Sequence, residues 1–373
     1  MNRLNRIFQL NKEDAQEKRR GGLAARAVAS AAGAVLLLCL SGCAALPFNF
    51  GTSDAQTGIS SLQSGAYDDA AASFQEQIDE GKESENVWRG LGIALMGKGD
   101  YQGAAEAFEK ALSMTNGLPG SMEYDINYYL GSCYFKMGNS AEALKVYDAI
   151  LALKPNDRQA RVLRGTVLIS MGDYEKAGED FRLAIDLSPG DYDLIIQIYE
   201  TMERYGYREA GKSYLQEAMQ KGGNSLSDYD RGRLFYYLEE YDSARVYLDR
   251  ARAEDSYRVM VLLGMTYEKL GDMNYARNVY QSYLSTDQSH PEVYNQLGLC
   301  QMNMGEYDAA LQSFERGLEI EDNEIRQSLK FNEIVALENL GEFRRAQVLM
   351  ESYLSEYPGD EAARREAIFL ETR

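Results

Sequence analysis

Apolar and polar positions along the chain repeat with a long period, and each period contains two segments with helical spacing. A glycine is followed twelve residues later by an alanine, and four residues after the alanine comes a bulky apolar residue. The stretches KGDYQGAAEAFEKAL (98–112) and MGDYEKAGEDFRLAI (171–185) show the second half of the period, which opens with a Gly-Asp-Tyr turn. The pattern predicts pairs of short amphipathic helices joined by tight turns.

The glycines and alanines at the fixed spacing of twelve predict how the two helices of a pair meet. A glycine inside a helix costs ~1 kcal/mol relative to alanine, so its recurrence at one phase indicates a packing role. Without a Cβ, the first helix lets the second lie close against it, and the alanine is the matching small residue. The repeat-packing pairs are Gly58 and Ala70, Gly92 and Ala104, Gly131 and Ala143, Gly165 and Ala177, Gly232 and Ala244, Gly264 and Ala276, and Gly298 and Ala310.

Such hairpins cannot bury their apolar faces alone, so they are expected to stack into an all-α solenoid. Two further units are degenerate, with Ile198 and Ile334 in place of the glycine and Ala210 and Ala346 as the alanines. Nine hairpins therefore fit between residues 55 and 358. The amphipathic stretch at 359–373 is predicted to be a capping helix for the last unit.

This pattern resembles the tetratricopeptide repeat. The residues of the second unit that carry the resemblance are Trp88, Leu91, Gly92, Tyr101, Ala104, Phe108 and Ala111, and Pro155 and Pro189 match the proline that ends a unit. The resemblance implies a scaffold that binds a protein or peptide partner on a concave surface lined by the first helices, without catalysis or cofactor.

One stretch of first helix offers residues typical of binding anchors. Tyr229, Arg233, Tyr236 and Tyr237 share one helical face, and Tyr199 and Met202 lie at corresponding places on the preceding first helix. By the resemblance, this face lines the concave surface, and these six residues are the predicted partner-binding site. The alternative is that the tyrosines only pack between helices.

One partner class known for the family is excluded by the sequence. Repeats that hold the carboxyl termini of chaperones use a clamp of Lys, Asn and Arg on successive first helices. At the matching places this chain has the pairs Arg89 and Ile93, Tyr128 and Ser132, and Val162 and Thr166.

The N-terminus is predicted to be an export signal. A basic segment precedes the uncharged stretch 27–40, and Leu40-Ser41-Gly42-Cys43 resembles the lipobox of bacterial lipoproteins. The resemblance implies that residues 1–42 are removed, that Cys43 is acylated, and that 43–54 is a tether at the extracytoplasmic face of a membrane. The alternative is that 27–46 is a single transmembrane helix, which would also place the repeats outside.

Charge and composition exclude other classes of function. The chain of 373 residues carries 39 basic and 58 acidic residues, a formal net charge of −19, which disfavours nucleic acid. A single histidine argues against histidine-based zinc sites and catalysis, so we expect no metal. Three functions remain open: a membrane-anchored scaffold, an envelope-assembly or secretion and pilus-biogenesis lipoprotein, and a glycan-binding protein.

Overall fold

The computed structural model describes residues 53–372, apart from positions 64, 116–119, 255 and 322. The predicted signal segment, Cys43, most of the tether and the alternative span at 27–46 lie outside the described residues. Within the described part of the chain, no helix has both the length and the apolar character needed to cross a bilayer.

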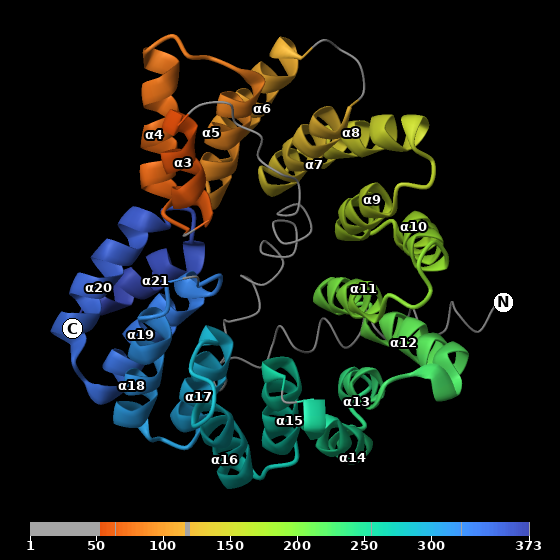
Figure 1. The fold of residues 1–373 in the computed structure, drawn as a ribbon, viewed down its shortest axis with the longest axis vertical. Helices are drawn as coiled ribbons and strands as arrows, with labels where there is room; N and C mark the ends of the chain where they lie inside the picture. Colours follow the sequence, from red (N-terminus) through yellow and green to blue (C-terminus); the bar gives the residue numbers. More distant parts are fainter. Residues whose placement is uncertain (1–52, 64, 116–119, 255, 322, 373) are drawn as a thin grey trace.

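The described residues form nineteen α-helices and no strands, arranged as nine successive hairpins with one further helix (Figure 1). The all-α solenoid predicted from the sequence is therefore confirmed. The first helices of the hairpins are α3 (Ser53–Gln63), α5 (Glu85–Gly97), α7 (Ser121–Lys136), α9 (Arg158–Ser170), α11 (Tyr192–Arg204), α13 (Asp228–Tyr237), α15 (Tyr257–Lys269), α17 (Pro291–Asn303) and α19 (Arg326–Leu340). Their second helices are α4 (Tyr67–Asp79), α6 (Tyr101–Met114), α8 (Ser140–Leu153), α10 (Tyr174–Asp186), α12 (Arg208–Gly222), α14 (Tyr241–Ala251), α16 (Met273–Leu284), α18 (Tyr307–Leu318) and α20 (Phe343–Glu356), and α21 (Glu361–Leu370) follows.

Each hairpin turn contains a residue in the left-handed conformation, and in some turns a side chain also caps the second helix. Gly172 ends the turn after α9 with φ of 83°, a conformation that costs glycine little. The carboxylate of the next residue, Asp173, then accepts a hydrogen bond from the Lys176 backbone N–H and caps α10. In the sixth hairpin Glu239 takes the place of the glycine at φ of 66°, and its carboxylate accepts a 2.6 Å hydrogen bond from Lys212 of the preceding hairpin.

The two helices of a hairpin touch where the first helix lacks a side chain. A Cβ on Gly165 would lie 2.6 Å from the ring of Phe181, and one on Gly264 would lie 2.2 Å from the ring of Tyr280. The alanines of the motif on the second helices, such as Ala177, are fully buried. The aromatic ring thus fills the space that the missing Cβ leaves.

The degenerate fifth hairpin makes its close contact at a different residue. Ile198 occupies the glycine position on the first helix, α11. The residue without a side chain is instead Gly211, on the second helix, α12. A Cβ on Gly211 would meet Tyr199 Cδ2 at 3.2 Å and Met202 Cβ at 3.3 Å. The small residue has therefore moved from the first helix to the second.

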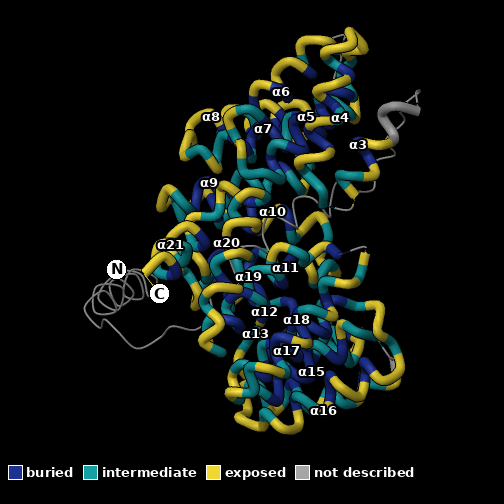
Figure 2. Tube along the Cα trace, turned by 90° about the vertical axis from the view of Figure 1, so that its left-hand side faces the viewer, coloured by how far each residue is buried: buried dark blue, intermediate teal, exposed yellow. Residues whose placement is uncertain are grey.

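Figure 2 shows buried residues along the whole solenoid, between the helices, rather than in one central core. The buried apolar side chains form successive clusters, each shared by neighbouring hairpins. The first helices lie on the inside of the curve and the second helices on the outside (Figure 1). The solenoid completes one turn, so that the turns after α3 and α5 lie beside the start of α19 and the turn between α20 and α21.

Candidate partner-binding surface

Three of the six predicted partner-binding residues are buried in the packing between helices. Met202 is 0%, Tyr199 2% and Tyr236 9% exposed. Tyr199 and Met202 lie against Gly211 of their own hairpin. The expectation that these three side chains are presented to a partner is therefore wrong, and the packing alternative applies to them.

The other three residues lie half-buried on α13 and connect it to α11. The Arg233 guanidinium donates hydrogen bonds to Asp193 and, at 2.9 Å, to Asp230, and it lies 4.9 Å from the centre of the Tyr229 ring. The Tyr237 hydroxyl donates a 3.0 Å hydrogen bond to Glu200. Arg233 and Tyr237 are therefore already hydrogen-bonded to residues of the same chain.

Glu200 and Tyr237 are both partly withdrawn from solvent. Burial raises the pKa of the Glu200 carboxyl above its ordinary value, although the hydrogen bond from Tyr237 acts in the opposite direction. Burial is also the main cause of the raised pKa of Tyr237, with the nearby charge of Glu200 adding to it. Tyr229, Arg233 and Tyr237 are half-buried, and partner binding at these three residues stays a prediction.

A set of residues that the sequence analysis missed extends the same surface toward the C-terminus. In the last three hairpins, the positions equivalent to Tyr229, Arg233 and Tyr236 hold mainly apolar side chains. Those that are half-buried and apolar, here named the apolar inner stripe, are Val261, Met265, Leu299, Met302, Phe331 and Val335. The sequence repeat could have identified these residues. Each lies three residues before, one residue after or four residues after the position that the motif glycine takes in its hairpin.

Consecutive first helices contact each other, so the stripe is continuous across α15, α17 and α19. Val261 and Met265 pack on one buried cluster and Leu299, Met302 and Phe331 on the next, which leaves each with part of its surface uncovered. Methionine side chains adapt to irregular partners because they are unbranched and polarisable.

The net acidity of the chain does not come from the inner helices. The nine first helices carry 12 basic and 13 acidic residues. Their nine second helices carry 13 basic and 20 acidic residues. The inner layer is thus nearly neutral, and the acidity lies on the outer helices and connections.

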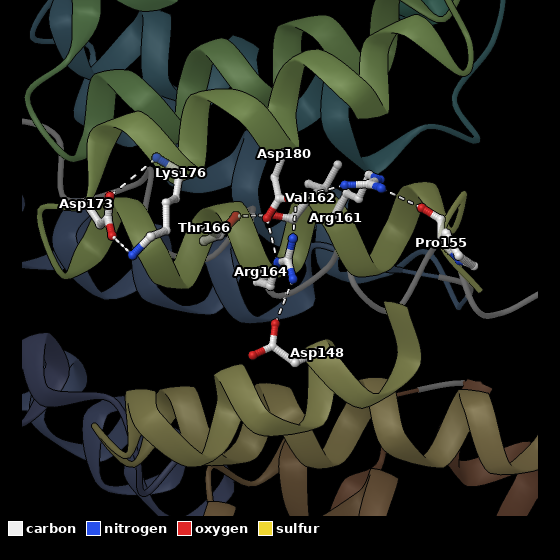
Figure 3. Close-up of polar contacts among 9 residues, drawn as sticks. All are labelled: Asp148, Pro155, Arg161, Val162, Arg164, Thr166, Asp173, Lys176 and Asp180. Carbon is white, nitrogen blue, oxygen red and sulfur yellow. Dashed lines mark hydrogen bonds and ion pairs between the residues drawn. The ribbon is translucent and has the colours of Figure 1, made fainter. Parts of the chain in front are cut away.

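In the most basic inner helix, α9, Arg161 and Arg164 pair with acids of neighbouring helices (Figure 3). Buried Asp180 of α10 accepts hydrogen bonds from Arg161 at 3.1 Å and from Arg164 at 2.7 and 2.8 Å. Arg164 also donates to Asp148 of α8 at 2.6 Å, which links the third hairpin to the fourth. The hydrogen bond with Asp180 is the main cause of the raised pKa of Arg164, so this guanidinium is held charged.

Residues at the positions where a carboxylate clamp would lie also make contacts within the chain. The Thr166 hydroxyl donates to the backbone oxygen of Val162 at 2.8 Å. Arg89 of α5 forms a buried ion pair with Asp125 of α7. Neither the α9 network nor this pair presents a free cation to a carboxylate ligand.

Comparison with known proteins agrees with this architecture. Sequence models described as tetratricopeptide repeat match residues 56–119 and 229–291, 95–165, 159–191 and 291–324, together more than half of the chain. The Protein CTR9 homolog of Arabidopsis thaliana is 19% identical over 320 residues, which are 80% of this chain and 28% of that protein. A TPR repeat-containing protein of Methanocaldococcus jannaschii is 24% identical over 249 residues, 61% of this chain and 41% of that protein.

The chain spans less than half the length of these two curated relatives. Among solved structures, yeast Tom70 is similar over 82% of this chain and 68% of that chain, with 19% identity and a TM-score of 0.48. A repeat protein from Parabacteroides merdae is similar over 68% of this chain and 98% of that chain, with 14% identity and a TM-score of 0.42.

Proposed function

Because the chain belongs to the tetratricopeptide-repeat family, we propose that it is a non-catalytic scaffold whose inner surface binds a segment of a partner protein. One observation carries the proposal: a continuous apolar inner stripe lies on a nearly neutral inner layer, while the outer layer is acidic. The partner segment would be apolar or aromatic, since the inner helices offer little net charge to attract a basic one.

Substituting the stripe tests this proposal. Met265→Glu places a charge among the apolar residues of α15, and we expect it to weaken binding of the partner by ~2 kcal/mol or more. Leu183→Glu is the matched control because Leu183 lies on the outer helix α10 with 46% of its surface exposed. Binding is measured by affinity capture from cells and quantified with the purified partner. Equal losses in both variants would contradict the proposal.

We further propose that the scaffold is anchored by lipid at the extracytoplasmic face of a bacterial membrane. The support is the basic segment, the uncharged stretch and the Leu40-Ser41-Gly42-Cys43 motif. An envelope-assembly or secretion role fits the same anchor and remains the second proposal, and glycan binding is the third.

The anchor has a direct test. Cys43→Ala removes the thiol that would carry the lipid, so we expect the precursor to stay unprocessed and to incorporate no fatty acid. Metabolic labelling with palmitate measures this. Label in the alanine variant would refute acylation at this residue.

A further inference from the structure

The two ends of the solenoid meet at a pair of glycines that are far apart in the sequence. Gly99 lies in the turn between α5 and α6, and Gly359 lies between α20 and α21. A Cβ on Gly99 would lie 3.1 Å from Gly359 Cα, and one on Gly359 would lie 3.2 Å from Gly99 Cα. The backbones of the second hairpin and of the C-terminal turn are therefore in direct contact, which closes the superhelical turn.

Around this contact the ends enclose a pocket rather than a packed core. Its volume is about 410 Å³, and residues of both ends line it. Tyr67 and Lys98 come from the first two hairpins, and Arg326, Tyr357 and Arg365 come from the C-terminal helices. A close-packed interface between hairpins would leave no such space.

The hydrogen bonds and ion pairs around the pocket lie within each end, and the interaction between the ends is a weaker one: burial and, after it, the nearby charge of Glu324 raise the pKa of Tyr67. Lys98 pairs with Asp68 at 2.6 Å. On the other side, Asp360 accepts a 2.7 Å hydrogen bond from Tyr353, and Arg326 donates at 3.0 Å to the backbone oxygen of Ile320. Among the described residues that line the pocket, no hydrogen bond or ion pair crosses from one end to the other.

We propose that this junction, here named the latch, opens and closes reversibly and controls entry into the groove. Neighbouring hairpins share buried clusters, whereas the latch has a glycine contact and a pocket, so it is the weakest link of the closed turn. A closed turn admits a partner segment only by threading a chain end along the axis. An open latch admits an internal segment from the side.

Distances between spin labels on the two ends test the latch in the full chain without any partner. Gln102→Cys on α6 and Ile368→Cys on α21 are exposed positions outside the pocket. Cys133 and Cys300 are buried, and burial raises the pKa of both thiols to about 12, so they react slowly with the label. Cys39 and Cys43, which lie outside the described residues, are replaced by serine in all variants. The two variants that carry only one of the added cysteines give the background labelling.

We expect pulsed electron paramagnetic resonance to show two distance populations in the otherwise unchanged chain, a short one for the closed latch and a longer one for the open latch. A single short distance would overturn the proposal, because the ring would then be rigidly closed. A single long distance would overturn it as well, because the ends would not meet.

A matched pair of glycine variants separates latch opening from local damage. Gly359→Val forces a side chain against Gly99, and we expect the long-distance population to become the major one. Gly190 lies in the same Pro-Gly-Asp turn sequence, with Asp191 capping α11 as Asp360 caps α21, but nothing lies within 4 Å of its Cβ position. Neither glycine has positive φ.

Gly190→Val should therefore leave both populations unchanged. If Gly359→Val and Gly190→Val give the same distances, the glycine contact does not hold the latch and the proposal fails. Because no partner is present, failure of the latch leaves the proposed binding function standing, and the reverse also holds.

Discussion

The residue with the largest structural role in the α9 network is Asp180, which accepts hydrogen bonds from two arginines while only 2% of its surface is exposed. Arg161 and Arg164 replace apolar residues that other hairpins carry at these places, such as Trp88 and Leu91. Buried ion pairs contribute little net stability, but removing one partner leaves uncompensated charge. The network therefore makes the fourth hairpin sensitive to a single substitution.

We expect Asp180→Ala to destabilise the protein by ~3 kcal/mol, because two arginine side chains lose their buried acceptor. The urea midpoint, followed by circular dichroism, measures the change. Lys176→Ala is the control, since the Lys176 and Asp173 pair is solvent-exposed and should leave the midpoint unchanged. A midpoint for Asp180→Ala that equals the control would show that the network is not structural.

At the residue scale, the sequence predicts which side chains share a helical face but not how deeply they are buried. Helical spacing groups Tyr229, Arg233 and Tyr237 on α13, because spacing fixes direction around a helix. It did not reveal that Tyr199, Met202 and Tyr236 are buried, because burial depends on how closely the neighbouring helix approaches. For Tyr199 and Met202 that approach is set by Gly211, which lies outside the regular glycine position, whereas Tyr236 is buried in the cluster that α13 shares with the following helices.

At the scale of the helix, the glycine spacing predicted the hairpins well because a missing Cβ has a direct steric meaning. The same argument distinguishes glycines within one hairpin. Gly165 on α9 has the Phe181 ring 2.6 Å from its Cβ position, whereas Gly178 on α10 has only the Tyr214 hydroxyl, at 3.7 Å. The first glycine is required by packing and the second is not.

We therefore expect opposite effects of the same substitution. Gly165→Ala should destabilise the protein by ~1–3 kcal/mol through overpacking against a fully buried ring. Gly178→Ala should stabilise it by ~0.5–1 kcal/mol, because alanine is the better helix former and the space is open. Thermal unfolding of both variants decides the matter, and a loss of similar size at the two positions would contradict the packing role of Gly165.

At the scale of the whole molecule, the number of hairpins could be predicted from the sequence but their closure into one turn could not. Each hairpin adds a small rotation, and the sum over nine hairpins determines whether the ends meet. The contact between Gly99 and Gly359 joins two turns that are far apart in the sequence, so no local pattern reports it. The nearly neutral charge of the inner layer could not be predicted from the overall charge of −19 either. It becomes visible only when the structure assigns each helix to the inside or the outside of the turn.

The central claim is that the partner lies on the inside of the turn. Its most direct test is photo-crosslinking in cells, with p-benzoylphenylalanine at Phe331 and Met265 of the apolar inner stripe and at Leu183 and Tyr275 of the outer helices. We predict that one and the same protein is crosslinked from both inner positions and from neither outer position. Crosslinks from the outer positions alone, or equally from both sets, would contradict an inner binding surface.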